Sequence, residues 1–143
     1  ESPHAPIGRF LTFVGTEEVG SFRGATPIVS RVFNEAVSNV IGPDTEMELV
    51  IDESVLSTSE REFPDALQRA YDLDQFTLYL SPDDIGYGLT LVDGRVFLGA
   101  YDESGNLVAS ADGNNERLRD WATARYTEFR RVATEAKPGR QSE

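Results

Sequence analysis

The sequence predicts an α/β fold of the α+β type, in which a mixed sheet carries helices on its faces. Helical and strand-like patterns alternate in the first half of the chain, two strand-like runs flank Asp93-Gly94, and a long amphipathic segment follows. Helices between strands favour parallel neighbours, whereas Asp-Gly between two alternating runs is a strong hairpin signal. We therefore expect parallel strands first, then an antiparallel meander, and finally a long C-terminal helix.

The chain length fits one domain. Its 143 residues suffice for a single hydrophobic core, which we expect in residues 7–136, between a flexible leader at 1–6 and a flexible tail at 137–143. The first residue is Glu1 rather than Met, which favours a piece of a longer chain or a processed product. No apolar run approaches the roughly 18 residues of a membrane helix, so we expect no membrane span.

The first half of the domain is expected to alternate helices with strands. Phe10, Phe13 and Val14 recur at helical spacing, whereas Met47 and Leu49 follow the two-residue period of a strand. The predicted elements are a helix at 7–15, for which a strand is the alternative, a strand at 19–24, a helix at 26–42, a strand at 47–52 and a helix at 57–71.

Capping residues predict where these helices begin. Thr26 is a favourable N-cap with Pro27 in the first helical position, directly after a strand. Ser57 and Glu60 have the spacing of a capping box, and Pro64 then restarts or bends the helix. The predicted buried stripe of this last helix consists of Phe63, Leu67, Ala70 and Tyr71.

The second half of the domain is expected to form strands joined by tight turns. Alternating apolar residues on either side of Asp93-Gly94 predict an antiparallel meander. Its strands are expected at 76–80, 87–92, 95–100 and 106–111. Asn114 or Asn115 then caps a long helix. The expected apolar face of that helix consists of Leu118, Trp121, Ala122, Phe129, Val132 and Ala133.

The charge pattern predicts a salt-adapted protein. The chain has 25 acidic residues against 13 basic ones, a formal net charge of −12, and Lys137 as its only lysine. At 1 M salt the Debye length falls to about 3 Å, so repulsion within an acidic surface costs little. An ordinary acidic mesophilic protein is the alternative, but the scarcity of lysine favours a halophilic, cytoplasmic protein. Duplex binding needs clustered Lys and Arg, so this domain alone is expected to repel DNA.

Several common kinds of catalytic and metal site are excluded by residue type. The chain has no cysteine, and its only histidine, His4, lies in the leader, where a mobile terminus cannot hold a reactive geometry. No glycine-rich phosphate loop is present. The carboxylate pairs Asp52-Glu53 and Asp83-Asp84 are interpreted as solvated surface. We therefore predict no catalytic residues, no metal site and no cofactor.

One edge of the predicted sheet is the candidate ligand site. Helix N-termini attract anions, and Arg23 and Arg31 lie near the predicted helix start at Thr26. Ligands of α/β sheets usually bind where strands end, and glycines there leave room, although a bulge or a close backbone approach also explains Gly86 and Gly88. Simple capping and surface ion pairs are the alternative for Thr26 and the arginines. The candidate ligand-binding residues are Arg23, Thr26, Arg31, Ser54, Gly86, Gly88, Gly99 and Asp102.

Four segments together resemble a known archaeal domain. They are Phe22–Val29 (FRGATPIV), Glu48–Asp52 (ELVID), Tyr87–Gly94 (YGLTLVDG) and Val96–Asp102 (VFLGAYD). Over residues 7–133 the chain is similar to the middle or C-terminal domain of the archaeal methanogenesis-filamentation regulator family, in its haloarchaeal form. In that family the domain follows an N-terminal winged helix-turn-helix. The resemblance implies a transcription-regulator domain that meets DNA only through a part missing from this chain.

The predicted hairpin also resembles, more distantly, the catalytic strand pair of the phospholipase D superfamily. That superfamily has the motif H-x-K-x-x-x-x-D-G, in which the histidine is the nucleophile and the lysine binds phosphate. Aligned on Asp93-Gly94, the histidine position holds Gly86, the lysine position holds Gly88, and residues 99–102 stand at the second motif. The resemblance implies a kept framework without its chemistry. The vacated space could hold an effector, as in the similar sugar-sensing domains of TrmB-like archaeal regulators, and an unrelated Asp-Gly hairpin is the alternative.

These observations favour a regulatory domain rather than an enzyme. We expect it to bind a small polar effector, to form a homodimer and to pass the binding event to the DNA-binding part of the regulator. A ligand-free dimerisation or protein-interaction module is the alternative, because Trp121, Tyr126 and Phe129 need not all fit one core. A residual hydrolase that uses Asp93, Asp102 and a metal is a third and less favoured hypothesis.

Overall fold

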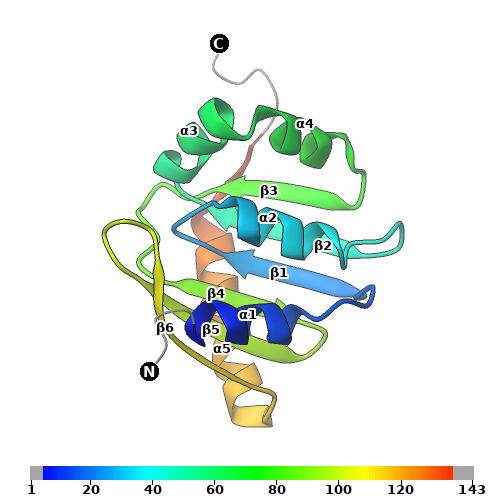
Figure 1. Ribbon diagram of the computed structural model, residues 1–143, viewed down its shortest axis with the longest axis vertical. Helices are drawn as coiled ribbons and strands as arrows, with labels where there is room; N and C mark the ends of the chain where they lie inside the picture. The colour runs from blue at the N-terminus through cyan, green and yellow to red at the C-terminus, as the bar shows by residue number, and fades with distance from the viewer. Residues whose placement is uncertain (1–4, 137–143) are drawn as a thin grey trace.

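The domain is built on one seven-stranded mixed sheet with the strand order β6-β5-β4-β1-β2-β3-β7 (Figure 1). The computed structural model describes residues 5–136, and the side chains of residues 7–136. The helices are α1 (Ala5–Val14), α2 (Arg31–Ser38), α3 (Glu53–Glu62), α4 (Pro64–Asp72) and α5 (Glu116–Val132). The strands are β1 (Ser21–Ala25), β2 (Glu46–Ile51), β3 (Phe76–Leu80), β4 (Gly88–Val92), β5 (Arg95–Tyr101), β6 (Leu107–Gly113) and β7 (Thr134–Glu135). The mixed sheet with a long C-terminal helix, predicted from the sequence, is thus confirmed.

The sheet has a parallel and an antiparallel half, as the order of helices and strands predicts. β1, β2 and β3 are parallel, β4 joins β1 antiparallel, and β4, β5 and β6 form the meander. The β4–β5 turn has positive φ angles at both Asp93 (50°) and Gly94 (84°), which the Asp-Gly pair tolerates and which a tight two-residue hairpin requires. The short strand β7, which the sequence reading missed, pairs antiparallel with β3.

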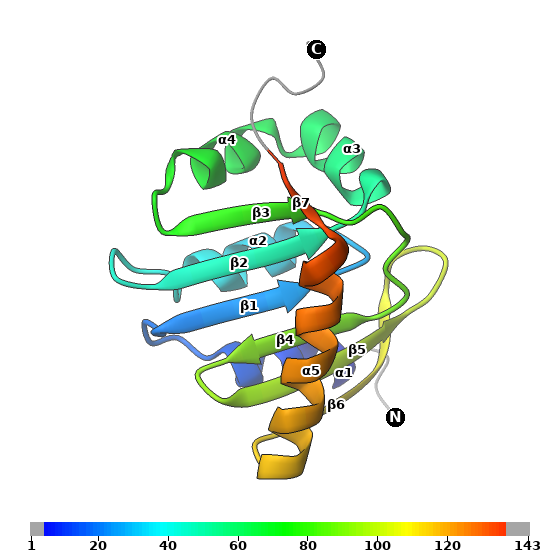
Figure 2. The same cartoon turned by 180° about the vertical axis from the view of Figure 1, so that it is seen from behind.

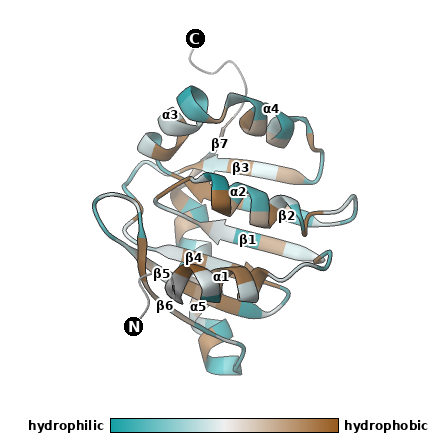
Figure 3. Cartoon of the chain, viewed as in Figure 1, coloured by the Kyte–Doolittle hydropathy of each residue, from teal (hydrophilic) through white to brown (hydrophobic). Residues whose placement is uncertain are grey.

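Helices cover both faces of the sheet. α1 and α2 lie over the face seen in Figure 1, with α3 and α4 beside β3, while α5 crosses the opposite face, as Figure 2 shows from behind. Side chains of β1 alternate between these faces: Phe22 belongs to the core under α1 and α2, and Ala25 to the core under α5. Hydrophobic residues run along β4 and β5, and hydrophilic residues concentrate on helices and loops (Figure 3).

The predicted helix at 26–42 is shorter at both ends. Thr26 is no N-cap, because it precedes Pro27 and stays extended, and its backbone N–H donates to the Val50 carbonyl (3.1 Å). Ser30 caps α2 instead, with its Oγ accepting from the Phe33 N–H (3.1 Å). The helix ends at Ser38 rather than near Gly42. No helix N-terminus therefore lies at Thr26, so the helix start on which the anion site was predicted is wrong.

A second predicted helix start is also wrong, because a buried aspartate caps the helix earlier. Asp52 is 4% exposed, and its Oδ1 accepts from the Val55 N–H (3.1 Å) and from Ser54 Oγ (2.7 Å). Its Oδ2 accepts from the Ile85 N–H (3.0 Å), which ties the chain before β4 to the end of β2. Ser57 lies inside α3, so it caps nothing, and Asp52 is not the solvated surface carboxylate that the sequence suggested.

The remaining helix ends follow the sequence closely. α1 begins at Ala5, before the expected start at residue 7, and buries Phe10, Phe13 and Val14 as predicted. α4 begins at Pro64, and Asn115 caps α5 by accepting from the Leu118 N–H (2.9 Å). The predicted leader before residue 5, including His4, and the predicted tail at 137–143 lie outside the described residues.

The apolar face predicted for α5 is partly wrong. Ala122 is buried as expected, and Tyr126, which was not assigned to the face, is only 2% exposed. Trp121 is 45% exposed and Val132 40% exposed, so both lie on the solvent side. The helix presents a narrow stripe to the sheet and leaves two large apolar side chains outside the core.

Candidate functional site

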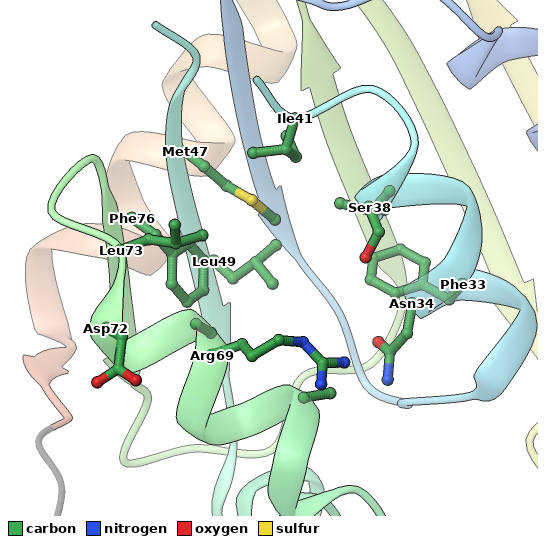
Figure 4. Close-up of a pocket in the computed structure, with 13 residues that line it drawn as sticks. Phe33, Asn34, Ser38, Ile41, Met47, Leu49, Arg69, Asp72, Leu73 and Phe76 are labelled. Carbon is green, nitrogen blue, oxygen red and sulfur yellow. The ribbon is translucent and has the colours of Figure 1, made fainter. Parts of the chain in front are cut away.

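A cleft lies between α2 and α4, above β2 and β3 (Figure 4). Its volume is about 430 Å³, which falls within the range of sites for small molecules. The lining residues are Phe33, Asn34, Val37, Ser38, Ile41, Met47, Leu49, Ala66, Arg69, Ala70, Asp72, Leu73 and Phe76.

Apolar side chains form the floor of the cleft, and a few polar ones stand at its opening. Met47 and Leu49 of β2 and Phe76 of β3 form the floor. Arg69 extends from α4 toward α2, where Asn34 lies (Figure 4). Among residues 5–136, no ion pair or hydrogen bond is formed by the Arg69 side chain. The cleft thus combines apolar walls with one guanidinium free to receive an anionic group.

The cleft exists because α4 covers the sheet incompletely. Ala66 and Ala70 are two of the α4 residues that line it, and their side chains are too small to fill the space toward α2. The stripe predicted to be buried, including Leu67, is only half-buried, and α4 has no buried residue at all. A narrower cavity of about 90 Å³ continues the cleft toward Thr26, with Phe33 and Ala70 among the residues common to both.

Most of the site residues proposed from the sequence do gather at one edge of the sheet. Thr26 and Ser54 follow the carboxyl ends of β1 and β2, and Gly88 pairs with Gly99 at the same edge. Ala25 at the end of β1 pairs with Leu89 beside Gly88, so the two groups are neighbours. Thr26 also lines the narrower extension of the cleft, which connects this edge with the space under α4.

Two of the three glycines at this edge are covered by neighbouring side chains. A Cβ added at Gly88 would lie 3.2 Å from Tyr101 Cε1, and one at Gly99 would lie 2.8 Å from Leu107 Cδ1. The space above Gly88, where the phospholipase D motif has lysine, is therefore filled by the Tyr101 ring, whose burial raises the pKa of its hydroxyl. Gly86, at the histidine position, has no atom within 4 Å of an added Cβ.

Asp102 and Ser54 make local hydrogen bonds at this edge. Asp102 Oδ1 accepts from the backbone N–H groups of Asn106 and Ser104 (both 2.9 Å). These hydrogen bonds, that from the Asn106 backbone foremost, hold the pKa of the Asp102 carboxyl below its usual value. Ser54 Oγ donates to Asp52. In the described structure both side chains support the turn and the helix start in which they lie.

The two candidate arginines lie on different sides of the sheet. Arg31 is the exposed first residue of α2. The side chain of Arg23 points under α5, where its guanidinium carbon is 5.6 Å from the centre of the Tyr126 ring. One site cannot draw on both charges without crossing the sheet.

Residues 5–136 contain no cluster of three His, Asp or Glu side chains able to hold a metal ion. Within the same range no helix is long and apolar enough to cross a membrane. The sequence reading did not select Arg69 or Asn34. The available signal was the pair Ala66 and Ala70, small residues four apart on the inner side of a short helix.

Sequence comparison assigns the chain to a family. The family described as the middle domain of the methanogenesis regulatory protein FilR1 matches residues 3–132, so the chain belongs to the FilR1 middle-domain family. None of the curated proteins compared with the chain is significantly similar in sequence. The resemblance to this regulator family, noted from four segments of sequence, is confirmed.

Several solved structures share the fold, TrmBL2 and a phospholipase D family member among them. TrmBL2, described as an archaeal chromatin protein with a novel mode of DNA binding, matches with a TM-score of 0.70 at 10% identity, over 92% of this chain and 50% of its own. Nuc from Salmonella typhimurium, a phospholipase D family member, matches with a TM-score of 0.64 at 12% identity. The match covers 92% of this chain and 90% of the Nuc chain. The chain thus spans half the length of the TrmBL2 chain. The fold likeness to the phospholipase D family, expected from the hairpin, is confirmed.

Proposed function

We propose that this FilR1 middle domain is the effector-binding part of a transcription regulator, and that its effector occupies the cleft between α2 and α4. The observation that carries the proposal is the cleft itself, an opening of about 430 Å³ with an apolar floor and one unpaired arginine. Sites for small molecules are mostly apolar, with a few polar groups that fix orientation. The cleft meets that description, with apolar residues on its floor and Arg69 and Asn34 among its polar lining residues.

The lining indicates what kind of effector fits. Met47, Leu49 and Phe76 suit an apolar body, and Arg69 suits an anionic head group. The Asn34 side-chain NH₂, at the α2 side, can donate a hydrogen bond to the same head group. The small polar effector expected from the sequence is therefore narrowed to a small amphipathic acid.

The charge of the domain assigns DNA contact to another part of the regulator. A net charge of −12 opposes binding to phosphate, whereas TrmBL2 is described as a DNA-binding protein and its chain is about twice as long. We propose that the domain passes its effector state to such a part, in the cytoplasm of a halophilic archaeon, where high salt screens the acidic surface.

The sheet edge predicted from the sequence is a second location for the effector. Gly86 has open space above it, and Thr26 and Ser54 lie at the same edge. The side chains that cover Gly88 and Gly99 reduce this space, so the cleft is preferred. Substitutions in the cleft and at the sheet edge can show which of the two locations binds the effector.

A homodimer module is the second candidate function, favoured by the exposed face of α5. Trp121 and Val132 are 45% and 40% exposed and eleven positions apart, which places them on one side of the helix after three turns. Large exposed apolar side chains that share a surface often mark protein contacts. This function does not require the cleft to bind anything.

The experiment that tests the effector site is thermal unfolding in about 3 M KCl, a salt level that screens the acidic surface, with defined acids and their uncharged amides. Octanoate and phenylacetate are the amphipathic probes, the corresponding amides test the head group, and glucose and inorganic phosphate are polar controls. An acid at about 100 times its dissociation constant adds about 2.7 kcal/mol of stability, which shifts the midpoint by several degrees.

Three variants locate the binding. Arg69→Gln is expected to remove the difference between acid and amide, Ala70→Leu to abolish both shifts, and Arg31→Gln to leave them unchanged. A shift that survives Ala70→Leu and disappears in Gly86→Val would place the effector at the sheet edge. A folded wild-type chain that responds to none of the acids and has the mass of a dimer by light scattering would replace the effector proposal by the dimerisation module.

A further inference from the structure

Another cavity lies on the opposite face of the sheet, between the β4–β5 turn and α5. Its volume is about 170 Å³, which is less than half that of the α2–α4 cleft. Two arginines from distant parts of the chain, one on β1 and one on α5, contribute to its wall. The polar residues that line it are Ser21, Arg23, Asp93, Arg119 and Thr123.

Arg23 lacks an acceptor at this cavity. Its Nε is buried without a hydrogen-bond partner, the one such side-chain atom among residues 5–136. The residue beside it on β2, Glu48, is already engaged, because it accepts from the Tyr126 hydroxyl (2.8 Å) and lies 3.7 Å from Arg130 Nε. A buried donor without an acceptor is costly, so a buried guanidinium N–H in this position points to a group that is not part of the chain.

The carboxylate that lines the cavity does not supply that acceptor. Asp93 Oδ1 accepts from the Ser21 N–H (2.9 Å), and Oδ2 accepts from the Gly20 N–H (3.1 Å), so both oxygens hold the turn against the start of β1. Arg119 donates from Nη1 to the Asn114 carbonyl (2.7 Å) and has further N–H groups. No ion pair of the described residues includes Arg23 or Arg119.

The composition of the chain makes this arrangement unusual. Acids outnumber bases by 25 to 13 in the chain, yet this cavity holds two arginines and one carboxylate, whose oxygens are engaged with backbone N–H groups. Two guanidinium groups around a small space form a local positive potential in a negative molecule. The Ser21 and Thr123 hydroxyls add donors to the same space.

We propose that this cavity binds a small tetrahedral oxyanion, either free phosphate or the terminal phosphate of a metabolite. Arg23 and Arg119 donate charge-assisted hydrogen bonds to it, and the hydroxyls of Ser21 and Thr123 complete the set of donors. The bound anion links β1 to α5 and satisfies Arg23 Nε. The site is on the other side of the sheet from the α2–α4 cleft, and its ligand is a polar ion rather than an amphipathic acid.

Titration calorimetry of the 143-residue chain with inorganic phosphate, at a constant KCl concentration of about 1 M, tests the proposal. Saturable binding is expected in the wild type, and Arg23→Gln or Arg119→Gln should weaken it about tenfold or more. Arg117→Gln, on the same helix but outside the cavity, is the matched control and should bind as the wild type does. Glycerol 3-phosphate in a parallel titration distinguishes the sources, because tighter binding than phosphate indicates a metabolite and weaker binding indicates the free ion.

Arg119 lies on an exposed part of α5, so Arg119→Gln is expected to fold even where Arg23→Gln does not. Absence of saturable phosphate binding by the folded wild type would overturn the proposal. Binding that remained unchanged in Arg119→Gln and in Thr123→Val would overturn it as well. Neither result depends on the α2–α4 cleft, so the two sites succeed or fail separately.

Discussion

The two faces of the sheet are covered in different ways. On one face a single helix of 17 residues, α5, closes the core, and Ala122 and Tyr126 beneath it are 0% and 2% exposed. On the other face four helices of 8 to 10 residues share the surface and leave the cleft between α2 and α4. A long helix packs continuously, whereas short helices with different axes leave gaps at their junctions. The open face is therefore where a ligand can enter.

Polar groups on the two faces also differ in their partners. Under α5, Tyr126 donates to Glu48, and the Arg130 guanidinium lies 3.7 Å from the centre of the Tyr79 ring. These polar side chains thus have partners within the domain. At the cleft, Arg69 has no such partner among the described residues. Arg23 is the exception on the closed face, which is why a separate ligand was inferred for it.

The largest expected difference in unfolding free energy comes from the same Leu→Ala substitution made once on each face of the sheet. Leu89→Ala should cost about 2–5 kcal/mol of unfolding free energy, because Leu89 is fully buried between the sheet and α5. Leu73→Ala should cost about 1 kcal/mol or less, because Leu73 is 40% exposed at the cleft. Denaturant unfolding of both variants at one KCl concentration measures the difference. Equal losses would mean that the cleft is closed in solution.

A smaller contrast is expected from adding atoms instead of removing them. Ala122→Leu should destabilise the domain by about 1–3 kcal/mol, because Ala122 is fully buried in the core under α5 and a larger side chain would overpack it. Ala70→Leu should change stability by about 0.5 kcal/mol at most, because the added atoms enter the cleft. The two variants make the same change on helices, so helix propensity cancels in the comparison. A large loss in Ala70→Leu would show that α4 already packs tightly.

The fold was largely predictable from the sequence. The errors in the predicted helix starts have a common cause. Alternation and the Asp93-Gly94 turn locate the meander, because both signals are local. The helix starts at Thr26 and Ser57 were misplaced because several residues nearby can cap a helix. Tertiary contacts choose among them: Thr26 continues the pairing with β2, and Asp52 caps α3 because it also binds the Ile85 N–H.

The candidate sites were less predictable, because they depend on distances between elements far apart in the chain. The edge residues could be grouped from strand order alone, since the ends of neighbouring strands share an edge. The cleft requires the spacing between α2 and α4, and no local pattern records it. The missing partner of Arg23 follows from its register beside Glu48 and from the position of α5, which no spacing in the sequence encodes.

The smallest expected effect concerns the hydrogen bond between Tyr126 and Glu48 under α5. It tests whether water is excluded from this space, as the burial of Tyr126 indicates. Burial, with a further contribution from the hydrogen bond to Glu48, raises the pKa of the Tyr126 hydroxyl well above its usual value. Tyr126→Phe should cost about 1 kcal/mol at neutral pH, because one hydrogen bond is lost and the ring remains. Chemical unfolding of the two proteins at pH 7 measures this loss.

The free energy of unfolding should depend on pH differently in the wild type and in Tyr126→Phe. In the unfolded chain Tyr126 ionises near pH 10, whereas in the folded domain it stays protonated, so the unfolded state binds fewer protons above about pH 10 and wild-type stability falls there. Tyr126→Phe lacks this contribution, so its deficit relative to the wild type should shrink as the pH rises from 9 to about 11. A deficit that stayed constant over this range would mean that the hydroxyl ionises equally in both states. Water would then reach the space under α5, and the contrast between a closed and an open face would no longer hold.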